Sequence, residues 1–359
     1  MRKLSSLLAA CALILVLGAC STDTSNSSSD SSGGEDGEQE LAKELKLFSF
    51  GDYWPEEVLK GFEEEYGVKV IYDPYGSNAE MLTKIQSGAV DYDIVVPTDY
   101  IAGRMIEKEM LQELNMDNIP NFENINPLFH ERDYDPGNKY TVPYLYGYIG
   151  MVYDQTKVKD PEGWEDLWNP EYAGHVLLSN VGREALTVAL QKNGYSQNDA
   201  SDEALEAAKK DLKALHPNVY AYESTASDIL SGNDVWIGAA YSGTVGMAMK
   251  NNENLMFKIP KEGGTIWMDN LAIPKVSKNK YTAEVFINYV LDAEVSKKIT
   301  DEIPYSNPNS AAVELMGDEE KNNPAAYPPE EDVKRADWYV DMGKDLTKMD
   351  QAWREVIGQ

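Results

Sequence analysis

A strand, a helix and a second strand follow one another in fewer than 30 residues near the start of the folded part, and this order restricts the fold more than any other feature. Apolar runs predict strands over 45–50 and 68–72. Between them, Pro55 at the start and Gly67 just past the end are typical boundaries for a helix over 55–66. Two strands and a connecting helix in so short a span form a parallel βαβ unit.

The same pattern continues along the chain. Ser77 and Glu80 have the spacing of a capping box, which predicts a second helix through residue 87. The apolar run within 93–97 predicts a third strand. Strands that alternate with helices indicate an α/β sheet with helices on both faces, and ligands of such sheets collect at the carboxyl ends of the strands. The residues just past these ends are Phe50, Asp52, Tyr53, Thr98, Asp99 and Tyr100.

The remaining folded part also mixes strands with helices. The long extended run 140–153, which contains two glycines, is a candidate for a strand that crosses between two lobes. The tail from Pro328 to the end is predicted to be helical, with Trp338 and Tyr339 near its start. Further strands are predicted over 176–178 and 235–240, and further helices over 182–193, 202–215, 281–291 and 293–302.

The stretch 262–274 carries the most specific chemistry. Two glycines precede Trp267 and Asp269, which are separated by one residue and therefore point the same way on an extended strand. A tryptophan ring attracts a cation and a carboxylate accepts N–H protons, so the pair suits an alkylammonium ligand. A core tryptophan beside an aspartate that caps a turn would give the same pattern, and this stretch alone leaves both interpretations open.

The amino terminus predicts export. Two positive charges, an apolar run over 7–17 and Leu-Gly-Ala-Cys at 17–20 indicate a signal peptide over 1–19, too short for a transmembrane helix of about 20 residues. The tetrapeptide resembles a bacterial lipobox, in which Cys20 is lipidated. Because Cys11 lies in the removed peptide, the mature domain has no thiol for a disulfide, a metal or catalysis.

Residues 20–44 are predicted to be a lipid-anchored disordered tether, because 21–40 is rich in Ser, Gly, Asp and Glu. About 320 residues follow, too many for one small core, so we expect two lobes. The formal charge of −29 excludes nucleic acid as a partner, since such a partner needs a basic surface. An acidic surface would steer cationic ligands inward, although a solvated acidic coat explains most of these charges.

Enzyme motifs are sparse. The three histidines, at 130, 175 and 216, are isolated, and the chain has no His-Glu-x-x-His pair, no Gly-x-Ser-x-Gly elbow and no phosphate loop. The acidic stretch at Asp133 is not an EF-hand, because Tyr144 occupies the position of its final Glu. We therefore predict no catalytic residues, no metal and no cofactor. Two carboxylates meeting in a cleft could still hydrolyse a glycoside, which keeps a surface glycoside hydrolase as an alternative.

The lipobox, the two-lobe α/β pattern and Gly-Gly-Thr-Ile-Trp-Met-Asp-Asn-Leu-Ala-Ile-Pro together give the chain a family resemblance. It resembles the spermidine/putrescine-binding proteins of bacterial polyamine ABC transporters over nearly everything after residue 45. The resemblance implies an α/β, two-lobed periplasmic-binding-protein-like fold of type II. Lobe 1 would comprise 45–149 and 268–313, and lobe 2 would comprise 150–267 and 314–359. Two crossing segments, near 149–150 and 267–268, are the candidate hinges.

The family's ligand site transfers to this chain residue by residue. The resemblance implies amine-binding carboxylates at Asp52, Glu184 and Asp269 and a hydroxyl at Thr98. Plainer roles remain open, since Glu184 could complement a helix amino terminus and Asp52 could cap the following helix. The implied aromatic residues are Phe50, Tyr53, Tyr100, Tyr241, Trp267 and Tyr305, with Tyr339 where the family has Gln.

Several positions depart from the family pattern. Phe50 and Tyr241 stand where Trp is common, and Val181 stands where the family usually has an Asp, three residues before Glu184. One ammonium anchor is therefore missing or replaced by a neutral acceptor such as Asn180. An unpaired buried charge is costly, so the ligand is either a diamine such as putrescine or spermidine held differently.

The resemblance also implies a function. We expect a monomeric solute receptor, not an enzyme, that closes on a polyamine and delivers it to a membrane ABC permease. A lipid on Cys20 would anchor it at the outer face of the cytoplasmic membrane, at the cell surface or in the periplasmic space. Besides the hydrolase, the alternatives are a same-fold receptor for another solute and an adhesin or sensor that binds a protein through the lobe exterior.

Overall fold

A computed structural model describes residues 39–51 and 53–358 of the chain. The predicted signal peptide over 1–19, Cys20 and Asp52 lie outside the described residues, so the roles expected of them stay predictions. The chain divides into two units, Met1–Gln39 and Glu40–Gln359. The second unit is compact and holds the elements described below.

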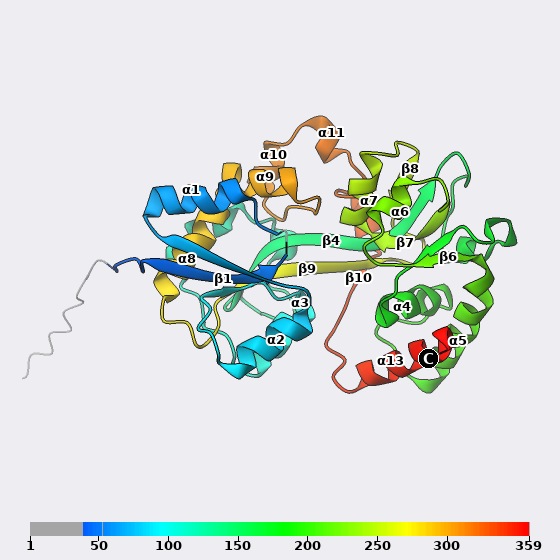
Figure 1. The fold of residues 1–359 in the computed structure, drawn as a ribbon, viewed down its shortest axis with the longest axis horizontal. Helices are drawn as coiled ribbons and strands as arrows, with labels where there is room; N and C mark the ends of the chain where they lie inside the picture. The colour runs from blue at the N-terminus through cyan, green and yellow to red at the C-terminus, as the bar shows by residue number, and fades with distance from the viewer. Residues whose placement is uncertain (1–38, 52, 359) are drawn as a thin grey trace, which may run out of the picture. The chain divides into compact units, whose positions relative to one another are not determined.

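One sheet organises this compact unit (Figure 1). Its strands in spatial order are β2 (Lys69–Tyr75), β1 (Glu44–Phe50), β3 (Ile94–Val95), β9 (Thr265–Ala272), β4 (Thr141–Asp154), β7 (Ile237–Tyr241), β5 (Val176–Leu178) and β6 (Val219–Tyr222). Two further strands, β8 (Leu255–Lys258) and β10 (Asp337–Trp338), pair with β4 and β9.

Helices gather around the two ends of the sheet and make two lobes (Figure 1). The β1 lobe holds β1, β2 and β3 with α1 (Glu56–Tyr66), α2 (Asn78–Ser87), α3 (Asp99–Glu107), α8 (Lys280–Val290) and α9 (Ala293–Glu302). The β5 lobe holds β5, β6 and β7 with α4 (Gly182–Lys192), α5 (Asp202–Leu215), α6 (Ser227–Ser231), α7 (Ser242–Met249) and α13 (Asp345–Ile357).

Shorter helices complete the fold. They are α10 (Ser310–Glu314), α11 (Asp318–Lys321) and α12 (Glu330–Val333), with 3₁₀ turns η1 (Met116–Asn118), η2 (Pro120–Asn124), η3 (Pro127–Phe129), η4 (Trp164–Trp168), η5 (Pro170–Tyr172) and η6 (His216–Asn218). Within the described part of the chain, no helix combines the length and the apolar character that a membrane crossing needs.

The predicted βαβ unit is confirmed. Strands β1 and β2 are parallel, and α1 between them starts after Pro55 and ends at Gly67, whose φ is 67°. Helix α2 starts after Ser77, whose hydroxyl accepts a hydrogen bond from the Glu80 amide at 3.2 Å. The Glu80 carboxylate bonds to the Gly76 amide at 2.9 Å rather than to that of Ser77, so the capping box is displaced by one residue.

Most other predicted elements agree with the structure within a few residues. Helices α5 and α9 coincide with the predicted 202–215 and 293–302. The third strand is shorter than the predicted 93–97, although the Pro97 carbonyl still accepts a hydrogen bond of 2.9 Å from the Asn270 amide of β9. Helix α3 and strands β6 and β8 were not predicted from the sequence.

Strands β4 and β9 run from one lobe into the other as an antiparallel pair (Figure 1). At one end β9 meets β3 of the β1 lobe, and at the other β4 pairs with β7 over 149–153. All of β9 is buried, and so is all of β4 except Tyr153. The predicted crossing strand over 140–153 is therefore confirmed.

The prediction that the tail from Pro328 is helical is wrong for its middle part. Trp338 lies on β10, which pairs in parallel with the start of β9, and α13 begins only at Asp345. The Asp337 backbone amide donates to the Gly264 carbonyl at 2.9 Å, and the Asn198 side-chain Nδ2 donates to the Trp338 carbonyl, also at 2.9 Å. These long-range hydrogen bonds replace the local ones that a helix would form.

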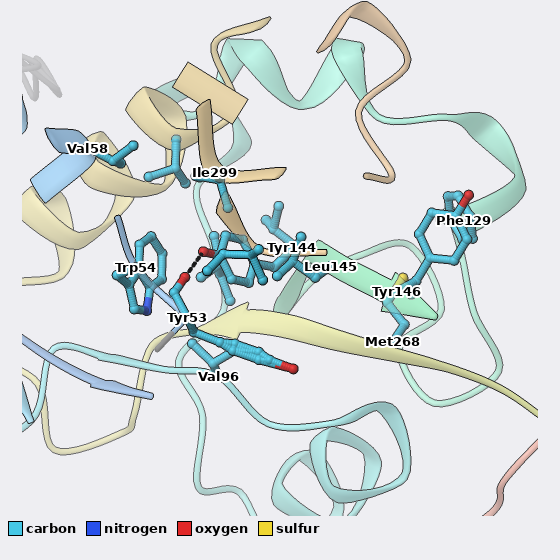
Figure 2. Packing of buried hydrophobic residues seen from close by; sticks show 14 of the residues in the cluster. Tyr53, Trp54, Val58, Val96, Phe129, Tyr144, Leu145, Tyr146, Met268 and Ile299 are labelled. Carbon is cyan, nitrogen blue, oxygen red and sulfur yellow. Dashed lines mark hydrogen bonds between the residues drawn. The ribbon is translucent and has the colours of Figure 1, made fainter. Parts of the chain in front are cut away.

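Core residues of the β1 lobe hold Tyr53 and Trp54, which follow β1, in position. Figure 2 shows the Tyr144 hydroxyl at the backbone carbonyl of Tyr53, to which it donates a hydrogen bond of 2.7 Å. The neighbouring Trp54 ring stacks on Tyr144 with 4.6 Å between ring centroids. Because Tyr144 belongs to β4, the strand that connects the lobes also positions the Tyr53 side chain.

Candidate ligand-binding site

A cavity of about 530 Å³ is lined by residues of both lobes. The β1 lobe contributes residues near the carboxyl ends of β1 and β3, as expected for a sheet of this type. The β5 lobe contributes the start of α4 and the end of β7. The predicted residues that line this cavity are Phe50, Tyr53, Thr98, Tyr100, Glu184, Tyr241, Trp267, Asp269, Tyr305 and Tyr339.

Asp269 is a buried carboxylate held by two hydroxyl groups. It lies on β9 with 2% of its surface exposed, and its backbone forms a bridge to Thr98. The Thr98 hydroxyl donates to Oδ1 at 2.7 Å, and the Tyr53 hydroxyl donates to Oδ2 at 3.0 Å. Burial raises the pKa of Asp269 to about 7, although both hydrogen bonds favour the charged form.

Glu184 is the counterpart of Asp269 on the β5 lobe. It lies in the first turn of α4 with 7% of its surface exposed. The Ser179 hydroxyl donates to Oε2 at 2.5 Å, and the Tyr241 hydroxyl donates to Oε1. Burial raises the pKa of Glu184, against the effect of these two hydrogen bonds. The side chain thus lies both at a helix amino terminus, as the plainer interpretation had it, and in the cavity wall.

Aromatic rings line the cavity between these carboxylates. Trp267 meets Tyr305 edge to face at 4.9 Å between centroids and Tyr241 at 6.2 Å. Tyr305 also stacks with Tyr53 at 6.1 Å, and Tyr53 lies 5.2 Å from Phe50. Trp267 is buried, with 7% of its surface exposed, as expected of a core tryptophan, and it also lines the cavity. Its role toward an alkylammonium ligand stays a prediction.

Two glycines make room for these rings. A Cβ atom on Gly147 of β4 would come within 2.6 Å of Cζ2 of Trp267. A Cβ atom on Gly243 of α7 would collide with the ring of Tyr305. Such separations are far below van der Waals contact, so any side chain at either position would displace a ring of the cavity wall.

Arg183 lines the cavity but was not predicted from the sequence. Its guanidinium carbon lies 4.0 Å from the ring centre of Tyr339 and 5.5 Å from that of Tyr100. It also donates to Asn198 Oδ1 at 2.8 Å and to the Val340 carbonyl at 2.9 Å. Tyr100 and Tyr339 therefore already contact a cation of the protein itself.

Other lining residues also escaped the sequence analysis. Asn78 had a weak signal, because it follows the helix cap Ser77, and its amide donates to the Thr98 hydroxyl at 2.9 Å. Leu346 and Asp350 of α13 had none, since only the tertiary position of that helix brings them to the cavity.

Among residues 39–51 and 53–358, no group of His, Cys, Asp or Glu side chains is arranged to hold a metal ion. The three histidines instead contact aromatic rings. His175 stacks on Trp236 at 3.6 Å between centroids, His130 on Phe122 at 4.8 Å and His216 on Tyr222 at 6.0 Å.

Two α/β lobes joined by a pair of antiparallel strands, with buried carboxylates and aromatic rings lining a cavity between them, define a two-lobed solute-binding receptor. Residues 57–329 match the family model described as bacterial extracellular solute-binding protein. The chain belongs to this family, among its spermidine/putrescine-binding members.

Relatives and solved structures agree with this assignment. The spermidine/putrescine-binding periplasmic protein of Escherichia coli K12 is 38% identical over 306 residues, 83% of this chain and 87% of the relative. The putrescine-binding periplasmic protein SpuD of Pseudomonas aeruginosa is 31% identical over 337 residues, 88% of this chain and 92% of the relative.

The crystal structure of a spermidine/putrescine ABC transporter substrate-binding protein, PotD from Streptococcus pneumoniae, is also similar. It is 35% identical, with a TM-score of 0.81, over 88% of this chain and 99% of that one. The predicted type II two-lobed fold is therefore confirmed.

Proposed function

We propose that the protein binds a polyamine, spermidine or putrescine, in the cavity between its lobes and passes it to an ABC permease. The observation that carries the proposal is the pairing of Asp269 and Glu184. Each is buried and accepts hydrogen bonds from two hydroxyl groups. Neither forms an ion pair with a Lys or Arg in the described part of the chain. Buried carboxylates without a cationic partner are costly, and an ammonium group would remove this cost.

The rings and the carboxylates play complementary parts in the proposed complex. Trp267 and Tyr305 offer faces and edges on which the methylene segments of a polyamine can lie. Cation–π contacts contribute roughly 0.5–2 kcal/mol each, whereas micromolar affinity needs about 8 kcal/mol. Asp269 and Glu184 therefore supply the larger share, through charge-assisted hydrogen bonds to the nitrogens.

Closure of the lobes is the proposed binding step. Asp269 is bonded to residues of the β1 lobe and Glu184 to residues of the β5 lobe, so a ligand that contacts both favours the closed form. We propose that the hinge lies on β4 and β9 near 149–150 and 267–268. We propose the lobe boundaries that the sequence analysis gave, with 45–149 and 268–313 in one lobe and 150–267 and 314–359 in the other.

The family supports a location outside the cytoplasm, and the amino-terminal sequence motivates our proposal of a lipid anchor. Relatives are extracellular or periplasmic solute-binding proteins. We infer in addition that lipidation of Cys20 anchors this chain to the outer face of the cytoplasmic membrane. We further infer that it acts as a monomer, without a cofactor and without enzymatic activity.

A thermal-shift panel tests the proposed function against its rivals. Putrescine, spermidine and spermine are expected to raise the melting temperature of a soluble form that begins at Glu40, because a ligand that binds only the folded state stabilises it. Cationic dipeptides, a ferric chelate and a chromogenic glycoside serve as the rival ligands. A shift produced by one of these and by no polyamine would replace the proposal with that rival.

A further inference from the structure

Helix α13 brings a carboxylate to the cavity from the far end of the chain. Leu346 and Asp350, which lie one turn apart on the same face of this helix, both line the cavity. The adjoining Met349, Ala352 and Trp353 are buried in the core of the β5 lobe. Asp350 therefore lies at the border between this core and the cavity.

The position of α13 is fixed by close contact with the start of α4. Gly182, the first residue of α4, leaves room for Trp353, since a Cβ atom there would lie 2.8 Å from Cβ and Cγ of Trp353. Asp350 precedes Trp353 by three residues and thus lies near it on the same side of α13. Glu184 follows Gly182 by two residues. Asp350 and Glu184 are consequently carried by two helices that pack against each other at this point.

Asp350 is the free carboxylate in this part of the wall. Val181, also in the cavity lining, is 43% exposed and has no polar side-chain atom. Arg183 is engaged with Asn198, Val340 and the ring of Tyr339. Asp350 itself is exposed, and its carboxylate forms no hydrogen bond or ion pair with any residue that the structure describes. It can accept a ligand ammonium without giving up an existing partner.

Resting on the proposed function, we propose that Asp350 accepts the outermost ammonium of a polyamine longer than putrescine. Asp269 and Glu184 then hold the two nitrogens that every polyamine has, and Asp350 discriminates by length and charge. The wall at Val181 offers no acceptor of its own, so the carboxylate from α13 supplies the one that a third nitrogen needs.

Paired titrations of the soluble form that begins at Glu40 test this role. Asp350→Asn is expected to weaken spermidine binding by about 5–20-fold, as for a charge-assisted hydrogen bond partly exposed to water, and putrescine binding by less than about twofold. The matched control is Asp345→Asn on the same helix, which removes the same charge from a residue that pairs with Lys348 and does not line the cavity. It is expected to leave both affinities within about twofold of the unaltered protein.

The outcomes separate this inference from the proposed function. If the unaltered protein binds no polyamine, the proposed function fails and this inference fails with it. If it binds both ligands but Asp350→Asn weakens them equally, or no more than Asp345→Asn does, only the role of Asp350 is overturned. Asp350→Glu keeps the charge and is expected to retain spermidine affinity within about threefold. A loss as large as that of Asp350→Asn would also overturn the role.

Discussion

The Tyr53 hydroxyl donates a hydrogen bond of 3.0 Å to Asp269, which lies 216 positions further along the chain. Tyr53 follows β1, and Asp269 lies on the strand that connects the lobes. The Tyr53 backbone is itself held by Tyr144 of β4. These contacts within the protein fix the orientation of the carboxylate, which lowers the entropic cost of binding.

Loss of the charge on Asp269 is expected to damage binding far more than loss of a hydroxyl on the aromatic wall. Asp269→Asn should weaken polyamine affinity by about 10–150-fold, the equivalent of one charge-assisted hydrogen bond. Tyr305→Phe should change it by less than about threefold, because the Tyr305 hydroxyl has no hydrogen-bond partner among the residues described. Calorimetric titration measures both. An unchanged affinity in Asp269→Asn would remove Asp269 from the site.

Polyamine affinity is expected to depend on pH in the neutral range. Burial places the pKa of Asp269 at about 7 and also raises that of Glu184. Only the charged carboxylates attract an ammonium, and alkylamines stay protonated below about pH 9. Affinity should therefore fall by up to about tenfold for each pH unit below 7 and level off above it. A titration series from pH 5 to 8 checks this, and Asp269→Asn should give a shallower profile. A flat profile in the unaltered protein would contradict it.

The same raised pKa predicts that Asp269 destabilises the empty protein at alkaline pH. The folded-state pKa of about 7 exceeds the usual 3.8, so the folded state binds the proton more tightly than the unfolded chain does. Proton binding to Asp269 therefore stabilises the folded state. This stabilisation is present in full below about pH 4 and is lost as the pH rises through 7. Asp269→Asn should therefore gain unfolding free energy relative to the unaltered protein between pH 5 and pH 8. Urea unfolding at both values measures the gain, and a constant difference would refute it.

Two glycines of α7 offer a matched pair for testing the aromatic wall. Gly243→Ala should push the Tyr305 ring out of position and weaken polyamine binding, with a loss of stability of about 1–3 kcal/mol. Gly246→Ala, on the same helix, has its nearest non-local atom at 3.9 Å and should be neutral or slightly stabilising. Titration and thermal unfolding of both variants decide the matter. Equal effects would mean that the contact between Gly243 and Tyr305 is unimportant.

Local signals explain which parts of the fold could be predicted from the sequence. The unit of β1, α1 and β2 was predicted because Pro55 and Gly67 mark the ends of α1 by their own backbone preferences. Strand β10 was missed because it forms only by pairing with β9, about 70 residues away, while its own sequence has no strand pattern.

In the candidate site, too, the residues with local sequence signals could be predicted, and those positioned by long-range packing could not. The residues that follow β1 and β3 could be placed by the rule for α/β sheets, and Trp267 with Asp269 by the alternation of a strand. The others came from family resemblance. Arg183 was missed although it is adjacent to Glu184, because its role depends on Tyr339, more than 150 residues away. Asp350 could not be found, since only the packing of Trp353 on Gly182 brings α13 to the cavity.

Calorimetric titration of the soluble form with putrescine, spermidine and spermine in parallel tests the central claim most directly. We predict binding of one polyamine per protein at micromolar affinity or better, with spermidine at least as tight as putrescine. Proton release should accompany binding near pH 7, as Asp269 gives up its proton. The absence of binding by all three would leave the fold and the family in place and contradict the assignment of this cavity to polyamines.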